Sequence, residues 1–449
     1  MEIIHIIGAG GVGMSALALL AKRRGATITA SDKNNSSYLQ KLASHGIHTW
    51  VGSQPEKIPQ DAHVYYSSAV KADDPERDFA ETHGFLCEPR HSLLKRITAD
   101  YFTIAIAGCH GKTTTSAWLA DLLIRAGKDP TALIGGTVPE WQSNYREGSG
   151  KLHGKPILVM EADESDRSFL SIDVDIALIT NVDLDHTDIH QSLAALENDF
   201  CAFADTARQN NGNIFLSSEC DGALLARLTP AEKEARAQVI IAMEKHSIAA
   251  QGMEYPVGLA GVHNLKNATL IVQLGLTLGI PPTVIAASLQ EFSGVNRRMQ
   301  RIATFPERHL TVIDDYAHHP HEVEATLAAL EPQYDRLLIF WEPHRLSRFV
   351  HFYREFAAVL EKYAAEHQLF LLPIYASGHK AEDYPHYEKL FQQFTKSHFV
   401  YIAQPSEFSL EPLALDGRNT AAVFMGAGAS SEYAQAFVEF VRQQLTQKR

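Results

Sequence analysis

A strand that runs into a glycine-bracketed turn and then into a helix is the feature that most constrains this sequence. The turn is Gly-Cys-His-Gly-Lys-Thr-Thr-Thr at residues 108–115; it follows apolar residues 102–107, and a helical pattern covers 116–126. Such a turn aims several backbone N–H groups and a helix N-terminus at one point, so it can cradle nucleotide phosphates. The sequence therefore predicts a nucleotide-binding α/β domain. The predicted nucleotide-binding residues are Gly108, His110, Gly111, Lys112, Thr113 and Thr114.

Two residues of this loop have distinct predicted roles. Lys112 would neutralise phosphate charge, and the Thr113 hydroxyl would ligate Mg²⁺. The usual phosphate loop has glycine six residues before the lysine, but Ile106 stands there, which predicts a shortened variant. The alternative is a bare tight turn that uses glycine only for backbone freedom.

Composition sets the broad class of protein. A chain of 449 residues with 45% hydrophobic and 21% charged residues is typical of a globular protein of two to four domains. It contains no apolar run of the roughly 20 residues that span a bilayer, and its N-terminus lacks the pattern of a signal peptide. Four cysteines without a Cys-x-x-Cys pair favour reduced thiols in the cytoplasm. The net charge of −13 disfavours nucleic acid, so an anionic ligand needs local donors.

The first segment alternates short strands and helices, which predicts a parallel sheet with helices on its faces. Its opening turn at residues 8–13 matches Gly-x-Gly-x-x-Gly, and Asp32 follows the second strand, where a ribose-binding acid belongs. The turn alone would predict an NAD(P)-dependent oxidoreductase. The motif is weak evidence, however, because it indicates only that a phosphate can approach a helix N-terminus. The expected strands are 2–7, 27–31 and 63–67, and the expected helices are 12–24 and 38–45.

Acidic clusters end two predicted strands of a second domain. This domain starts with the strand 102–107, and further strands are expected at 156–161, 175–181 and 237–242. Glu161 begins the first cluster and His186 ends the second, at the sheet edge where open α/β sheets bind ligands. Carboxylates beside phosphates suit Mg²⁺, with His186 as a further ligand or orienting group. Solvated loop charges are the alternative.

A third domain is predicted after Arg298, where strand and helix signals resume. Polar clusters again end strands, at 314–320 and 342–345. Arg345 and Arg348 lie three residues apart, so on a helix they share a face and could hold a carboxylate or phosphate. The expected strands are 310–313, 336–340, 369–374 and 421–425, and the expected helices are 347–362 and 432–444.

Taken in order, these motifs resemble the peptidoglycan Mur ligases, and within that family the alanine-adding branch. The resemblance implies three α/β domains on mainly parallel sheets flanked by helices: a Rossmann-like domain at 1–98 for a UDP-sugar, a P-loop domain at 99–299 for ATP, and a Rossmann-like domain at 300–449. The motifs that carry it are the glycine turn 8–15, Ser67-Ser68-Ala69-Val70, the loop 108–115, the segments 161–166, 181–188 and 261–268, Arg297-Arg298, the segment 314–320, and Pro343-His344-Arg345.

The resemblance also implies an activity and residue roles. It implies an ATP- and Mg²⁺-dependent ligase that joins L-alanine to the lactyl carboxylate of UDP-N-acetylmuramate through an acyl phosphate, as a cytoplasmic monomer or homodimer without nucleic-acid or membrane partners. The implied catalytic residues are Lys112, Glu161, His186 and Arg298, and the implied metal ligands are Thr113, Glu161 and His186. The implied nucleoside contacts are Asn264, Asn267 and Asp315. The implied substrate contacts are Gly10, Gly11, Val12, Gly13, Asp32, Ser67, His186, His344, Arg345 and Arg348.

Three positions depart from the family pattern. Cys109 stands where threonine is usual, Glu342 where glutamine is usual, and Ala429 where aspartate is usual. Three alternatives stay open: a ligase of the same family that recycles murein tripeptide, a nucleotide-gated binding protein, and the oxidoreductase. Ser165-Asp166-Arg167-Ser168-Phe169 follows the alanine-adding form rather than the recycling one.

Overall fold

The computed structural model describes residues 2–185, 189–190, 192–395, 399–409 and 417–446. The chain forms two compact units. The first unit comprises Met1–Asp183, Leu193–Gly258 and Lys266–Ser293, and the second comprises Leu184–Ser192, Leu259–Leu265 and Gly294–Arg449. Three of the described sheets lie in the first unit and one lies in the second. Within the described ranges, every helix falls short of the length and apolar character needed to cross a membrane.

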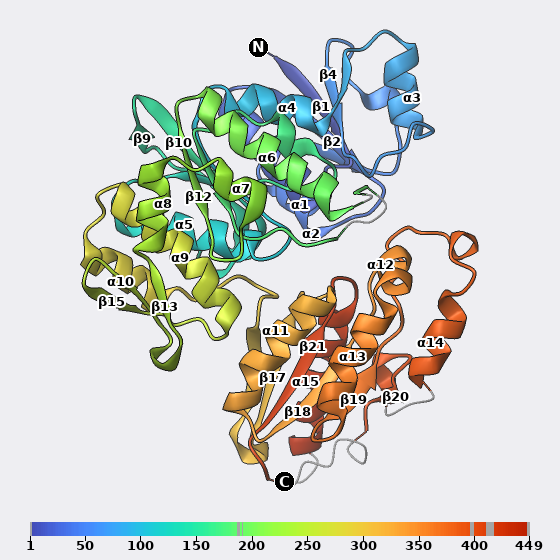
Figure 1. The fold of residues 1–449 in the computed structure, drawn as a ribbon. Helices are drawn as coiled ribbons and strands as arrows, with labels where there is room; N and C mark the ends of the chain where they lie inside the picture. Colours follow the sequence, from blue (N-terminus) through green and yellow to red (C-terminus); the bar gives the residue numbers. More distant parts are fainter. Residues whose placement is uncertain (1, 186–188, 191, 396–398, 410–416, 447–449) are drawn as a thin grey trace. The chain divides into compact units, whose positions relative to one another are not determined.

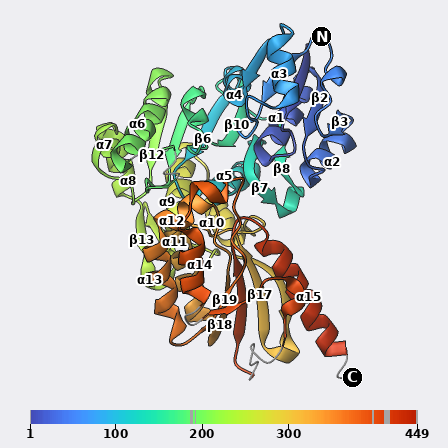
Figure 2. The same ribbon diagram turned by 90° about the vertical axis from the view of Figure 1, so that its right-hand side faces the viewer.

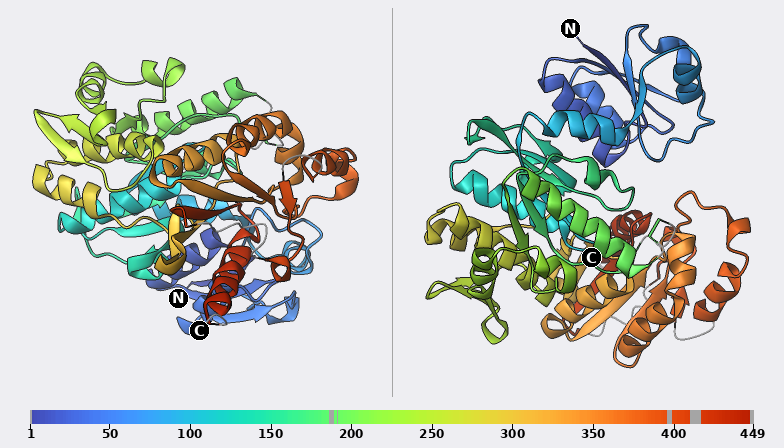
Figure 3. Two further views of the ribbon diagram at one scale, coloured as in Figure 1. Left: turned by 90° about the horizontal axis from the view of Figure 1, so that it is seen from below. Right: turned by 45° about the horizontal axis from the view of Figure 1, so that its top comes forward.

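The N-terminal sheet is parallel and has the strand order β3-β2-β1-β4-β5. Helices flank it (Figure 1, Figure 3), and α1 buries a continuous apolar face that includes Leu17 and Leu20 against Ile4 and Ile6. Because all five strands run the same way, their carboxyl ends share one edge. The elements are β1 (Ile3–Ile7), α1 (Val12–Arg23), β2 (Thr27–Asp32), α2 (Ser37–Ser44), β3 (His48–Val51), β4 (His63–Tyr66), α3 (Pro75–Thr82), β5 (Cys87–Pro89) and α4 (Arg90–Thr98).

A seven-stranded sheet follows in the order β12-β11-β6-β10-β7-β8, with β9 paired to β10. Strands β8 and β9 are antiparallel to their neighbours, and the other pairs are parallel. Every residue of β6 is buried, as its continuous apolar pattern predicts for a central strand. The strands are β6 (Phe102–Ala107), β7 (Thr131–Val138), β8 (Ser143–Arg146), β9 (Lys151–Leu152), β10 (Lys155–Glu161), β11 (Ile176–Ile179) and β12 (Asn213–Leu216).

The helices of this region confirm the predicted helix after the loop, which starts at Lys112 rather than Ser116. Helix α9 contributes its first residues to the second unit and the rest to the first. The helices are α5 (Lys112–Arg125), α6 (Leu193–Gln209), α7 (Gly222–Ala226), α8 (Pro230–Ala237), α9 (Val262–Thr277) and α10 (Pro282–Glu291).

The strand expected at 237–242 is shorter and lies in a different sheet. The Thr229 hydroxyl and the Glu232 carboxylate form a capping box, and the helix that it starts, α8, runs through Ala237. Only β13 (Ile240–Ala242) remains extended, and it pairs antiparallel with β14 (Ser247–Ala250), which pairs with β15 (Met253–Pro256). The expected strand is therefore confirmed only over its last three residues.

The sheet of the second unit has the order β16-β17-β21-β18-β19-β20, and only β16 is antiparallel to its neighbour. Figure 2 shows α15 on one face of this sheet and α11 and α13 on the other. Alternate residues of β18 serve these two cores: Phe340 packs with Phe437 of α15, and Ile339 lies in the core with Val323 of α11. The strands are β16 (Gln300–Phe305), β17 (Leu310–Asp315), β18 (Arg336–Trp341), β19 (Gln368–Leu371), β20 (Phe399–Tyr401) and β21 (Thr420–Met425).

The single helix expected over 347–362 is two helices. Phe352, with φ −100° and ψ 21°, leaves the helical conformation between α12 and α13. Its ring is buried and packs edge-on against His319 at 4.7 Å between ring centroids. This packing accompanies a change of direction that the sequence pattern does not reveal. The helices of the second unit are α11 (Pro320–Leu330), α12 (Leu346–His351), α13 (Tyr353–Ala364), α14 (Tyr387–Thr395) and α15 (Ser430–Thr446).

Candidate functional site

The predicted phosphate loop joins β6 to α5 and needs both of its glycines. Gly108 has φ +137° and Gly111 has φ +82°, conformations that other residues rarely adopt. A Cβ on Gly108 would lie 2.0 Å from the Thr180 hydroxyl, and one on Gly111 would lie 2.6 Å from Oδ1 of Asn267. The glycines therefore let neighbouring elements approach the loop backbone closely.

The carboxyl end of β11 holds the loop in shape. The Asn181 side chain accepts a hydrogen bond from the His110 backbone N–H and donates one to the His110 carbonyl, both at 2.9 Å. The Thr180 hydroxyl donates to the same carbonyl at 2.6 Å, and a ring nitrogen of His110 lies 3.0 Å from the Asp183 carboxylate. The sequence prediction omitted these supporting roles, although Asn181 and Asp183 belong to the acidic segment that it noted at this strand end.

Lys112 turns back onto its own loop and onto Glu164. Its ammonium donates to the Gly108 carbonyl at 2.7 Å and to the two Glu164 carboxylate oxygens at 2.8 and 3.1 Å. Only 1% of the Glu164 side chain is exposed, and this burial raises the pKa of its carboxyl to about 7, against the opposing influence of Lys112. The loop therefore holds its lysine on an internal carboxylate.

Thr113 and Glu161, the two predicted metal ligands within the described residues, lie together. The Thr113 hydroxyl donates to Glu161 Oε2 at 2.9 Å, and the Gly135 N–H donates to the same oxygen at 2.9 Å. A hydroxyl and a carboxylate beside a phosphate loop are hard oxygen donors of the kind that Mg²⁺ takes. His186, the third predicted ligand, lies outside the described residues.

Cys109 packs beneath the loop. It is 8% exposed, and its thiol donates to the Asp183 carbonyl at 2.9 Å while accepting from the Asp183 N–H at 3.2 Å. Cysteine thus fills the position with a small side chain that supports the segment after β11.

The N-terminal sheet brings the glycine turn, Asp32 and Ser67 to one edge. Gly8 has φ +78°, and a Cβ there would lie 2.9 Å from Cβ of Ser67. The Asp32 carboxylate accepts the Gly10 N–H at 2.9 Å and the Asn34 N–H at 2.9 Å. Asp32 therefore shapes the turn, and its predicted contact with a ribose stays a prediction.

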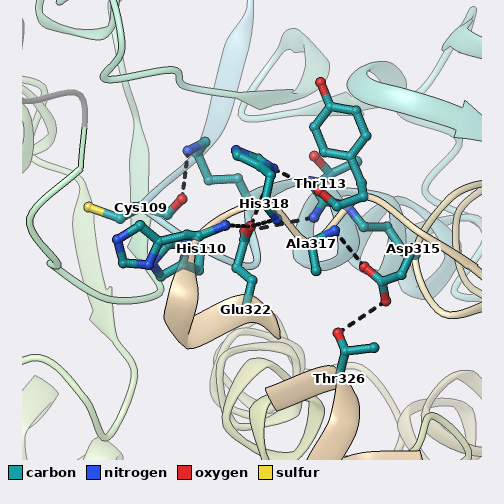
Figure 4. A network of polar contacts seen from close by, with 12 residues as sticks. Cys109, His110, Thr113, Asp315, Ala317, His318, Glu322 and Thr326 are labelled. Carbon is teal, nitrogen blue, oxygen red and sulfur yellow. Dashed lines mark hydrogen bonds and ion pairs between the residues drawn. The ribbon is translucent and has the colours of Figure 1, made fainter. Parts of the chain in front are cut away.

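In the second unit, Asp315 is held by its own surroundings. Figure 4 shows its carboxylate between the Ala317 N–H, at 2.8 Å, and the Thr326 hydroxyl, at 3.3 Å; the Met299 N–H donates to it at 3.0 Å. Burial raises the pKa of Asp315 to about 6. The other predicted nucleoside residues lie on α9, with Asn264 in the second unit and Asn267 in the first.

Two partly buried histidines of the second unit lie against each other and favour the neutral form. The rings of His318 and His344 pack at 5.5 Å between centroids. Burial lowers the pKa of His318 well below its usual value, and burial with the charges of Arg348 and Arg345 lowers that of His344 to about 3. A neutral imidazole can accept a proton or a hydrogen bond, so this pair adds acceptor capacity beside the two arginines.

The arginines of the predicted carboxylate site have different partners. Arg348 donates from Nε and Nη2 to the two oxygens of Asp185 at 3.0 and 2.9 Å, and both side chains are almost completely buried. Arg345, with φ +68°, donates from Nε to a ring nitrogen of His379 at 3.2 Å. Arg298, the predicted phosphate clamp, lies over the Tyr316 ring at 5.0 Å. The prediction missed Asp185 as the partner of Arg348, because nothing in the sequence links residues so far apart.

Glu342 and Ala429, two of the residues that depart from the expected family pattern, contact each other. Glu342 accepts the backbone N–H groups of Gly428 and Ala429 at 2.7 and 2.6 Å, just before α15 begins. Glu342 is 1% exposed, and burial raises the pKa of its carboxyl to about 7. A carboxylate thus lies before the N-terminus of α15 although residue 429 has none.

Comparisons with known proteins cover almost the whole chain. Family models described as the Mur ligase family catalytic domain, the Mur ligase middle domain and the Mur ligase glutamate ligase domain match residues 3–102, 106–274 and 297–428. The UDP-N-acetylmuramate--L-alanine ligase of Aquifex aeolicus is 31% identical, with 97% of each chain aligned, and that of Gloeobacter violaceus is 36% identical over 77% of this chain and 76% of its own.

Solved structures agree on the fold. The UDP-N-acetylmuramate-alanine ligase MurC of Thermotoga maritima matches with a TM-score of 0.76 and 24% identity, over 99% of this chain and 100% of that one. The murein peptide ligase of Psychrobacter arcticus matches with a TM-score of 0.66 and 20% identity, over 98% of both chains. The predicted α/β architecture of three domains is confirmed.

The raised pKa of Glu342 predicts a pH-dependent stability. Ionising this carboxyl costs more in the folded protein than in the unfolded chain, so the free energy of unfolding falls as the pH rises from about 4.5 through about 7. Relative to Glu342→Gln, we expect the wild type to lose on the order of 2–3 kcal/mol between about pH 5 and pH 8. Urea unfolding at both pH values measures this difference. Glu307→Gln, at an exposed site, is the control, and an equal response of the two variants would contradict the prediction.

Proposed function

Because the chain belongs to the Mur ligase family, we propose that it is the ATP-dependent ligase that joins L-alanine to UDP-N-acetylmuramate in peptidoglycan precursor synthesis. The observation that carries this function is the match along nearly the entire chain to ligases of that name, at 31% identity with 97% of each chain aligned. The glycine turn then serves a sugar nucleotide, and the oxidoreductase alternative is set aside. The recycling-ligase alternative has the weaker support of a structural likeness at 20% identity.

The reaction needs an activated carboxylate, because a carboxylate oxygen is a poor leaving group for amide formation. An oxygen of the lactyl carboxylate attacks the γ-phosphorus of ATP, ADP leaves, and an acyl phosphate forms. The alanine amine then attacks the acyl carbon, inorganic phosphate leaves, and the nitrogen loses a proton. Lys112 offsets the negative charge on the transferred phosphoryl group.

We assign the metal and phosphate contacts to the loop and the strand ends beside it. Thr113 and Glu161 would hold Mg²⁺, with His186 as a further ligand or as a contact to the substrate carboxylate; the ion would stabilise charge on the phosphates. The existing hydrogen bond between Thr113 and Glu161 supports this assignment. Gly108, His110, Gly111 and Thr114 complete the phosphate cradle.

The remaining assignments concern the two outer domains. We propose that residues 1–98 bind the UDP-sugar through Gly10, Gly11, Val12, Gly13, Asp32 and Ser67, and that residues 99–299 bind ATP. The domain 300–449 would receive the amino acid through His344, Arg345 and Arg348. Asn264, Asn267 and Asp315 would contact the nucleoside, and Arg298 would contact the γ-phosphate. We propose a cytoplasmic monomer or homodimer, since ATP and UDP-sugars are cytoplasmic metabolites.

One assay tests the function directly. Purified protein with MgATP and UDP-N-acetylmuramate should form ADP when L-alanine is added, and far less with a panel of other amino acids or with no amino acid. A murein tripeptide as the preferred acceptor substrate would favour the recycling ligase. ADP formation that ignores both the sugar nucleotide and the amino acid would favour the nucleotide-gated binding protein.

Replacing the loop lysine tests whether ATP and the sugar nucleotide bind at separate sites. Lys112→Ala should abolish ADP formation, because it removes the cation that stabilises the transferred phosphoryl group. Binding of UDP-N-acetylmuramate, measured by calorimetry, should stay nearly unchanged, because the glycine turn belongs to a different sheet. A collapse of sugar-nucleotide affinity in this variant would contradict the domain assignment.

Two glutamates of one segment provide a matched comparison. Glu161→Gln should weaken Mg²⁺-dependent turnover more than Glu164→Gln, because Glu161 contacts Thr113 whereas Glu164 contacts Lys112. Titration of activity with Mg²⁺ at fixed ATP should show a raised metal requirement in Glu161→Gln only. An equal or reversed effect would move the metal ligand to Glu164.

A further inference from the structure

The substrate contacts predicted within residues 1–98 include no cation. The chain carries a net charge of −13, and the turn already contains the Asp32 carboxylate bonded to the Gly10 N–H. Helix α1 starts after Gly11 without a side-chain cap and without an acidic residue in its first turn. A helix N-terminus attracts anions, but a pyrophosphate carries more charge than a helix dipole balances.

Arg90 brings a guanidinium to this point. It is the first residue of α4 and follows β5, so it lies at the sheet edge that holds the glycine turn. A Cβ built on Gly13 would lie 3.2 Å from Nη2, 3.4 Å from Nε and 3.5 Å from Cζ of Arg90. Gly13 has an ordinary backbone conformation, so its lack of a side chain matters here for the close approach of Arg90 and not for backbone freedom.

Within the described part of the chain, the hydrogen bonds of Arg90 engage only one of its three guanidinium nitrogens. Nη1 donates to the Ser168 hydroxyl at 3.0 Å and lies 3.4 Å from the Asp166 carboxylate. Nε is buried and has no hydrogen-bond partner among the described residues. Nε and Nη2 are the two nitrogens with which arginine binds two oxygens of a phosphate or carboxylate, and both lie within 3.4 Å of the Cβ position of Gly13.

We propose that Arg90 is a binding residue for the pyrophosphate of the sugar nucleotide, oriented by Ser168 and Asp166. The inference rests on the proposed function, because it assumes a UDP-sugar at the glycine turn. A buried donor without a partner is costly, and a phosphate oxygen would satisfy it. Ser168 and Asp166 follow the segment that begins with Glu161, so the same two contacts tie the substrate arginine to the metal-binding strand end.

A purely structural brace is the competing explanation. On that account Arg90 only links α4 to the segment of Ser168 and Asp166, and removing those partners would do the same damage as removing Arg90. On the binding account, the charge and fork of Arg90 matter to the ligand, and its partners only orient it. The two accounts therefore differ in what the variants do to ligand affinity.

The test measures dissociation constants for UDP-N-acetylmuramate, UDP and ADP by calorimetry on the full chain. Arg90→Ala should weaken UDP-N-acetylmuramate and UDP about 10- to 100-fold, the range for hydrogen bonds to a charged group, and leave ADP affinity unchanged. Arg90→Lys should recover part of the loss, because it restores charge without the fork. Arg96→Ala, on the same helix but paired with Glu2, should bind like the wild type.

The double variant Asp166→Asn with Ser168→Ala separates binding from bracing. The double variant should keep most of the affinity for UDP. Thermal unfolding checks that each variant is folded. An affinity of Arg90→Ala equal to that of the wild type, or a loss in the double variant as large as in Arg90→Ala, would overturn the proposal and leave the proposed function intact. A wild-type protein that fails to bind UDP-N-acetylmuramate would instead overturn the proposed function.

Discussion

The shape of the phosphate loop depends on the hydrogen bonds between His110 and the end of β11. Backbone N–H groups can bind phosphate strongly only if they already point to one place, because reorienting them on binding would cost much of the gain. The Asn181 side chain bonds both the N–H and the carbonyl of His110, and Thr180 adds a bond to that carbonyl. The glycines on either side permit this close packing. Two adjacent parallel strands of one sheet, β6 and β11, therefore supply both the loop and its support.

Buried ion pairs hold two of the cations that we assign to the ligand sites. Lys112 rests on Glu164, and Arg348 rests on Asp185. Taking charges out of water is costly, so each buried cation needs an anion at every stage. A phosphate or a substrate carboxylate that reaches these cations replaces or joins an existing partner rather than meeting a bare charge. The affinity for a ligand in such a site depends on the free-energy difference between the cation paired with the protein carboxylate and the cation paired with the ligand. This difference favours ligands that offer a matching charge and geometry.

The sequence predicted local elements well and long-range partners poorly. The β6 to α5 unit was predictable because an apolar strand, two glycines and a helix pattern lie within one short segment. The break at Phe352 and the antiparallel pairing of β13 were not, because the packing of a buried ring and the pairing with β14 accompany them, and neither shows in the local sequence pattern. The same limit applies to the site. Thr113 was predicted from the loop motif and Glu161 from its position at a strand end, whereas Arg90 became visible only through its approach to Gly13.

The second unit shows how a family pattern can change at two positions and keep its charge. Against the pattern that the resemblance implies, glutamate stands in place of glutamine at position 342 and alanine in place of aspartate at position 429, which would move the carboxylate from the start of a helix to the end of a neighbouring strand. Glu342 still meets the N–H groups of Gly428 and Ala429 before α15. The carboxylate thus stays at the positive end of the helix dipole, where it is favourable. The new position is more buried, which raises the pKa of Glu342 to about 7, so the relocated charge becomes sensitive to pH in the neutral range.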